Sequence, residues 1–237
     1  MENQFLARAS MIGNLMTNDR SGKNLGETAI KEVQKMVLFD KYGIENDISS
    51  KYIDKGIQNE KIGVQMAIDV LDWFDVDVNK PKLRYTNEWL TGEPDVDSNM
   101  ILGDIKCSFD GTTFPWFANE CPNKVYFYQM QSYMWLMDRD HAFLVYALTN
   151  HPEQMLNDEI NRAVWRGLAN PKYESLSQSE IEEIMDQQIR SQFTFDHIPM
   201  EKRIKSFRIE RDENVIDAMK TRIELVREIY QTMWKQI

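Results

Sequence analysis

The spacing of hydrophobic residues along the chain switches between the period of a helix and that of a strand. The first third has apolar residues three or four positions apart, which is typical of amphipathic helices. From residue 83, short runs rich in β-branched and aromatic residues replace this pattern, and helical spacing then returns. The pattern predicts helices over 10–17, 26–42, 49–74, 122–138, 152–169, 177–193 and 213–236. It predicts strands over 83–91, 100–108, 142–148 and 203–209.

Local signals indicate where some of these elements begin and end. Ser10 precedes the first expected helix and Ser49 or Ser50 the third, and serine is a good helix N-cap. The segment 92–99 (GEPDVDSN) is typical of a turn between two strands. The order of helices, strands, a helix, a strand and more helices predicts an α/β domain in which helices flank a central mixed β-sheet.

Length and composition narrow the class of protein. The 237 residues suffice for one hydrophobic core, so we expect a single domain over 1–237 with a helical insertion around 150–200. No apolar run approaches the roughly 18 residues of a membrane helix, and the first residues lack a signal-peptide core. We therefore expect a soluble, cytoplasmic protein with no membrane partner.

The cysteines and histidines argue against several kinds of metal site. Cys107 and Cys121 are too few for an iron–sulfur cluster, which needs about four thiolates, and they lack the spacing of a zinc site. We expect both to be reduced core residues, because nothing indicates an oxidising compartment. The histidines are scattered and form no HExxH pattern.

The net charge of −10 argues against tight, non-specific binding to DNA. It does not exclude an enzyme that acts on DNA, because such an enzyme needs only a locally basic lining. Carboxylates that hold a divalent metal also add negative charge of their own. Charge therefore leaves nucleic acid open as a substrate.

Acidic residues gather where the first two expected strands meet. Asp104 and Lys106 are two apart on the second strand and share one face, while Ile105 and Cys107 share the other. A tight turn brings Asp95 beside them. Converging carboxylates need a positive charge between them, so the pattern predicts Mg²⁺ with a lysine that orients or deprotonates a water. A lone D-x-K also fits a solvated strand edge, but the upstream Gly-Glu-Pro-Asp favours the catalytic interpretation.

Gln129 and Tyr133 are four residues apart on the helix expected over 122–138, so they share a face. Apolar and aromatic residues surround them in the sequence. The pair is either the polar edge of a core helix or a pair of side chains that faces the acidic cluster.

Taken in order, three motifs resemble one family. The motifs GEPD (92–95), DIKC (104–107) and QMQSYMWL (129–136) are similar to those of the lambda-exonuclease or YqaJ-type branch of the PD-(D/E)XK nucleases, related to RecB-type nuclease domains. The segments KGIQNE (55–60) and SFRIERDE (206–213) resemble this branch more loosely. The chain departs from it at Asp104, where glutamate is common, and in the length of the segment 150–200.

The resemblance implies a restriction-endonuclease-like core, with Mg²⁺ or Mn²⁺ as cofactor. The expected roles divide among metal ligands, a residue that positions the nucleophilic water, and supporting residues. The implied metal ligands are Asp95, Asp104, the carbonyl of Ile105, and Glu60 directly or through water. In the implied catalytic set, Lys106 positions water, Gln129 holds Lys106 or the scissile phosphate, and Tyr133 supports the helix.

The family also uses an arginine and a serine near its N-terminus to hold a 5′-terminal phosphate. Arg8 and Ser10 are the first candidates for these positions, and Arg20 is a second. Helix N-termini favour phosphate, but Ser10 as a simple cap and Arg8 as a solvated side chain are the plain alternative.

The implied function is digestion of duplex DNA ends, 5′ to 3′, leaving 3′ single strands for recombination, by a phage-encoded enzyme. The implied partners are duplex ends, a single-strand annealing protein and two further copies in a ring. An endonuclease or single-strand-specific nuclease on the same fold is the closest alternative. A catalytically idle module that binds DNA ends or protein is another. An ATP-driven motor is not supported, because Ser21-Gly22-Lys23 lacks the preceding glycine of a P-loop.

Overall fold

The structure is a computed structural model, and it describes residues 5–22, 24–44 and 51–237. The helices are α1 (Ile12–Leu15), α2 (Glu27–Tyr42), α3 (Lys51–Leu71), α4 (Lys124–Met137), α5 (Glu153–Leu168), α6 (Gln178–Phe193) and α7 (Glu213–Gln236). Short 3-10 turns cover Pro171–Tyr173 and Met200–Lys202. The strands are β1 (Ala7–Arg8), β2 (Tyr85–Thr86), β3 (Leu90–Gly92), β4 (Val96–Asp97), β5 (Leu102–Cys107), β6 (His141–Ala147) and β7 (Ile204–Glu210). Of the described residues, no helix is long and apolar enough to cross a membrane.

Each helix expected from the sequence is present, but the expected start of the first one is wrong. Met11, not Ser10, is the N-cap of α1, and it makes no side-chain capping bond. The chain is still extended before that point, because the Ala7 and Ala9 amides donate to the carbonyls of Trp89 and Thr91. Arg8 therefore lies in β1 rather than at the start of a helix. The expected caps of the third helix, Ser49 and Ser50, lie outside the described residues.

The expected strand over 83–91 is a hairpin instead of one strand. The side chain of Asn87 accepts bonds from the amides of Trp89 and Leu90, and this closes a tight turn between β2 and β3. The segment expected as a turn contains the short strand β4, which pairs with β5. Both differences arise from side-chain and long-range bonds that periodicity does not report.

Two mixed sheets replace the single central sheet expected from the sequence. One has the order β1-β3-β2, and the other has the order β4-β5-β6-β7 with β5 and β6 parallel. Pro94 lies between β3 and β4, and proline cannot donate a ladder bond. The chain leaves one sheet and enters the other at this point, directly before Asp95. Helices flank the sheets, so the α/β class is confirmed in this form.

Strand β5 is covered by a different helix on each face. Leu102 packs with α4 residues such as Met130, while Ile105 packs with α3 residues such as Ala67. A methyl group added to Gly63 of α3 would lie 2.9 Å from Ile105 and 3.0 Å from the Cys107 sulfur. Helix α3 therefore packs too closely on β5 for any larger residue at this position, which fixes the helix that carries Glu60.

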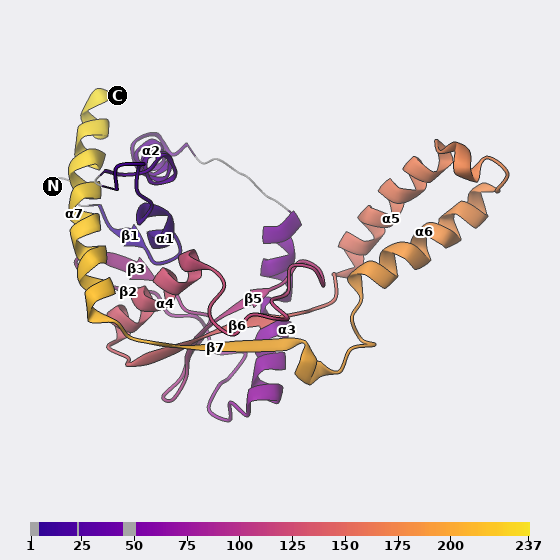
Figure 1. Ribbon diagram of the computed structural model, residues 1–237, viewed down its shortest axis with the longest axis horizontal. Coiled ribbons are helices and arrows are strands. Elements are labelled where there is room, and N and C mark those ends of the chain that lie inside the picture. The colour runs from indigo at the N-terminus through magenta and orange to yellow at the C-terminus, as the bar shows by residue number, and fades with distance from the viewer. Residues whose placement is uncertain (1–4, 23, 45–50) are drawn as a thin grey trace.

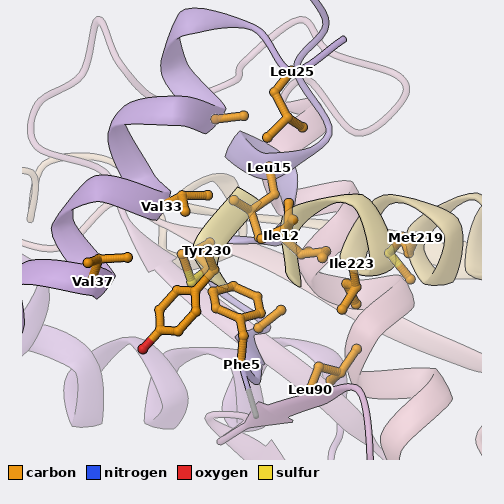
Figure 2. Close-up of a cluster of buried hydrophobic side chains, with 14 of the residues drawn as sticks. Phe5, Ile12, Leu15, Leu25, Val33, Val37, Leu90, Met219, Ile223 and Tyr230 are labelled. Atoms are coloured by element: carbon orange, nitrogen blue, oxygen red, sulfur yellow. The ribbon is translucent and has the colours of Figure 1, made fainter. Parts of the chain in front are cut away.

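A separate apolar cluster joins the two ends of the described chain. Helix α7 packs through Ile223 and Tyr230 against α1, α2 and β3 (Figure 2). The Tyr230 hydroxyl donates to Asp40 of α2 at 2.7 Å. This cluster holds β1 and α1 in place, and Arg8 with them.

Helices α5 and α6 form a hairpin that projects away from the rest of the molecule (Figure 1). They bury a small cluster of their own, centred on Ile181 and Met185 of α6 and Val164 of α5. Ser177 and Glu180 form a reciprocal capping box at the start of α6. The hairpin coincides with the segment that the sequence marks as an addition to the family pattern.

Lys55 of α3 is fully buried and connects this helix to the ends of β5 and β6. Its ammonium donates to the carbonyls of Ser108, Phe109 and Thr149 at 2.7, 2.9 and 2.7 Å. Burial lowers the pKa of Lys55 to about 8, which leaves it protonated at neutral pH. All three ammonium protons are therefore used to hold α3 against the sheet.

We predict that Lys55→Met lowers the free energy of unfolding by about 3 kcal/mol, because three buried carbonyls lose their donor. Urea denaturation followed by circular dichroism measures this change. Lys61→Met is the matched control, since Lys61 is an exposed lysine on the same helix. A loss below about 0.5 kcal/mol for Lys55→Met, similar to that of a surface change, would show that the three bonds do not hold α3.

Candidate active site

One large cleft of about 870 Å³ opens beside the end of β5. Its walls come from β1, α3, β3, β5 and α4, so segments distant in sequence meet there. The structure brings together in this cleft nearly all of the site residues predicted from the sequence. They are Arg8, Ser10, Glu60, Asp95, Asp104, Ile105, Lys106, Gln129 and Tyr133.

Asp104 is the most buried acid of the cleft, with 2% of its surface exposed. Its Oδ2 lies 2.5 Å from the Lys106 ammonium but makes no hydrogen bond of acceptable geometry. Burial raises the pKa of Asp104 to about 6, because the attraction of Lys106 offsets only part of the lost hydration. In Lys106 itself burial acts to lower the pKa, but Asp104 outweighs it and the pKa is raised.

Gln129 and Tyr133 of α4 face Asp104 from the other side. The Gln129 amide donates to Asp104 Oδ1 at 3.0 Å and to the Tyr133 hydroxyl at 2.8 Å. The Tyr133 hydroxyl donates to the Glu93 carbonyl at 3.1 Å. Gly92 makes this approach feasible, since a methyl group there would lie 2.8 Å from the Tyr133 ring. Gln129 thus holds Asp104, whereas the sequence suggested Lys106 or the substrate as its partner.

Asp95 is fixed by the backbone of the neighbouring strand. The Ile105 amide donates to Asp95 Oδ2 at 2.8 Å. This bond locks the carboxylate that follows Pro94 onto the strand that carries Asp104. The two metal-binding candidates therefore face the same part of the cleft, as the sequence pattern predicted.

Lys82 is a site residue that the sequence reasoning missed. Its ammonium lies 2.6 Å from Asp95 Oδ1 and 2.7 Å from Glu60 Oε1, so it bridges two of the predicted metal ligands. Burial acts to lower the pKa of Lys82, but the two carboxylates outweigh it and raise the pKa. No local motif marks this residue, because it stands after Pro81 in a segment that reads only as the end of a helix.

The donor set fits a hard divalent cation such as Mg²⁺ or Mn²⁺. The carboxylates of Glu60, Asp95 and Asp104 and the carbonyl of Ile105 could supply oxygen ligands. Asp104 Oδ2 is buried and, apart from its ion pair with Lys106, accepts no hydrogen bond. Across the described part of the chain, no three His, Cys, Asp or Glu side chains form a ready-made metal cage. The ammonium groups of Lys82 and Lys106 instead stand among these carboxylates.

Of the phosphate-binding candidates, the structure places only two in the cleft. Arg8 is exposed at its wall, with its guanidinium 5.7 Å from the centre of the Phe39 ring. Ser10 lines the cleft as well but does not begin a helix. Arg20 is exposed and does not line the cleft. The N-terminus of a helix therefore does not form a pocket around Arg8.

The raised pKa of Asp104 predicts how the metal-free protein responds to pH. The folded state binds the proton on the Asp104 carboxyl more tightly than the unfolded chain does. The stabilisation of the folded state by this proton is therefore fully present below about pH 4 and is lost as the pH rises through about 6. Between these values wild type should lose about 2–3 kcal/mol of unfolding free energy relative to Asp104→Asn. Urea denaturation in EDTA at several pH values measures the difference, and parallel profiles would contradict it.

The fold of the chain is similar to that of known exonucleases. No protein-family model and no curated protein sequence matches the chain. The crystal structure of a phage-related exonuclease from Haemophilus somnus 129PT matches with a TM-score of 0.72 and 25% identity, over 98% of this chain and 96% of that one. The alkaline exonuclease LHK-Exo from Laribacter hongkongensis matches with a TM-score of 0.64 and 14% identity, over 98% and 90%. A structure of LHK-Exo in complex with dAMP gives 0.62 and 15%, over the same shares. The chain is thus structurally similar, over nearly its whole length, to a phage-related exonuclease and to an alkaline exonuclease.

Proposed function

We propose that this chain is a metal-dependent deoxyribonuclease that removes nucleotides from the ends of duplex DNA. The observation that carries the proposal is the cluster of Asp95, Asp104 and Lys106 in the main cleft of an exonuclease-like fold. Carboxylates that can hold a divalent cation, with a lysine beside them to orient water, are groups that can hydrolyse a phosphodiester through a metal-activated water.

The residues of the cleft would have distinct roles. Asp95 and Asp104 would hold the cation, with the Ile105 carbonyl and Glu60 completing the oxygen set. The cation, when bound, lowers the pKa of water and neutralises charge on the phosphate. Lys106 would orient the attacking water by donating a hydrogen bond to it, since its ammonium already lies in the cleft beside Asp104. Gln129 and Tyr133 would keep Asp104 in one orientation.

The substrate would be a DNA end, digested 5′ to 3′ to leave a 3′ single strand for recombination in a phage context. A structure of similar fold, LHK-Exo, holds dAMP, which supports a nucleotide-containing substrate. A ring of three copies around the duplex and an annealing protein as partner remain part of the proposal. A ring with a basic interior would reconcile DNA binding with the net charge of −10.

Two alternatives use the same cleft. An endonuclease or single-strand-specific nuclease would need only a different path for the DNA, which the fold does not decide. A catalytically idle module that binds DNA ends or protein would not need Lys106 beside Asp104. The presence of both residues in one ion pair favours an enzyme.

We predict that Asp104→Asn and Lys106→Met each reduce Mg²⁺-dependent cleavage at least about a hundredfold, because they remove a metal ligand or the water-positioning group. Release of acid-soluble nucleotides from linear duplex DNA measures the rate. Asp217→Asn and Lys220→Met are matched controls, since they break an exposed ion pair on α7 that does not line the cleft. Near-normal rates in either well-folded cleft variant would refute the assignment.

The position of Arg8 at the cleft wall leads to a prediction on polarity. A guanidinium binds a terminal phosphate dianion strongly and a hydroxyl weakly, so Arg8→Ala should slow digestion of 5′-phosphorylated ends at least about tenfold. Digestion of 5′-hydroxyl ends should change little. Arg20→Ala is the control, because Arg20 lies outside the cleft. An equal response of both ends to Arg8→Ala, or digestion from 3′ ends, would show that the polarity is wrong.

A further inference from the structure

Lys82 contacts two carboxylates of the acidic cluster without lining the cleft itself. It is not among the cleft-lining residues and lines instead a small groove of about 20 Å³. Asp95 lines both, so it separates the groove from the cleft. The side chain of Lys82 is 28% exposed, and its ammonium contacts Asp95 and Glu60 at the same time. The ammonium therefore lies between two carboxylates that a cation entering from the cleft would need.

We propose that Lys82 is a built-in counter-ion that takes the place of the divalent cation in the metal-free protein and withdraws when the cation binds. The inference rests on the proposed function, because it assumes that Asp95 and Glu60 are metal ligands. It assigns to Lys82 a positioning role that sets the affinity of the site for metal. Lys82 itself touches neither water nor phosphate in this role.

Electrostatics explains why such a counter-ion is needed. Asp95 and Glu60 lie close enough to share one ammonium, and two carboxylates in such a place repel each other unless a positive charge separates them. Lys82 supplies that charge when no metal is present. A divalent cation on the same oxygens would meet the ammonium at contact distance, where like charges repel strongly, so both cannot be bound there together.

Lys82 and Lys106 differ in a way that assigns withdrawal to Lys82. Lys106 extends from β5 inside the cleft, and its ammonium lies 4.6 Å from the centre of the Tyr126 ring as well as beside Asp104. Lys82 extends from the segment between α3 and β2, through the groove that Asp77 and Asp97 also line. The side chain of Lys82 is partly exposed, and its flexible four-carbon stem allows the ammonium to turn away from Asp95 and Glu60 toward solvent.

The neighbouring Lys80 provides a matched control. It belongs to the same segment, carries the same charge, and lines the same groove. Its ammonium donates to the Asp97 carbonyl at 2.6 Å instead of bridging Asp95 and Glu60. Removing Lys80 therefore changes the charge of the groove without vacating the metal position.

The test is calorimetric titration of the metal-free protein with Mn²⁺, without DNA, for wild type, Lys82→Met, Lys82→Gln and Lys80→Met. Removing one like charge next to a metal should tighten the dissociation constant on the order of tenfold in both Lys82 variants. It should change less than about twofold in Lys80→Met. The rise in Tm caused by saturating Mn²⁺ should also be larger in the Lys82 variants, since tighter binding to the folded state stabilises it more. The two Lys82 substitutions guard against one that fails to fold.

The outcomes distinguish failure of the counter-ion role of Lys82 from failure of the metal site itself. Binding that Asp104→Asn abolishes, but that is unchanged or weaker in both Lys82 variants, would overturn the counter-ion role and leave the metal site intact. Equal tightening in Lys80→Met and Lys82→Met would also overturn it, because the effect would then be one of general charge. Failure of wild type and all variants to bind Mn²⁺ at millimolar concentrations would overturn the metal site and the inference together.

Discussion

The burial of one carboxylate, Asp104, is the constraint on which the rest of the site depends. Only 2% of this residue is exposed, and the cost of burying its charge is offset by the ion pair with Lys106 and by the hydrogen bond from the Gln129 amide. A carboxylate in such a place is costly, so the fold must supply donors from several elements at fixed positions. Strand alternation brings Lys106 to the same face, and α4 brings Gln129 and Tyr133 opposite it. In the proposed nuclease this buried carboxylate would have a use, because an anionic oxygen that accepts no hydrogen bond is a good ligand for a hard cation.

Helix α3, which contributes Glu60 to the acidic cluster, is held against the sheet at two points. Its close packing on β5 depends on Gly63, which leaves no room for a side chain. Its other anchor is Lys55, whose ammonium is saturated by three carbonyls at the ends of β5 and β6. Lys55 and Lys82 thus have different roles. The fully buried Lys55 donates to neutral carbonyls and holds α3 in place, whereas the partly exposed Lys82 forms its ion pairs with Asp95 and Glu60, the carboxylates proposed to bind the metal.

Much of this architecture was predictable, because most helices here bury one apolar face and so keep a clear period in the sequence. The stripe of α7 that includes Ile223 and Tyr230 is an example, and the alternation of β5 predicted which side chains share a face. The division into two sheets was not predictable, since it depends on where Pro94 interrupts pairing. The hairpin at Asn87 was missed because one side chain closes it. Lys82 was missed because its role depends on a loop that periodicity does not place.

An enzyme that acts on DNA ends can be distinguished directly from one that cuts within the duplex. Linear duplex DNA and covalently closed circular duplex of the same sequence are incubated with the protein in Mg²⁺ and in EDTA, and released mononucleotides are followed with time. We expect steady release from the linear duplex in Mg²⁺, none in EDTA, and an intact circle under both conditions. Conversion of the circle to nicked or linear DNA at a comparable rate, or release of nucleotides in EDTA, would contradict it.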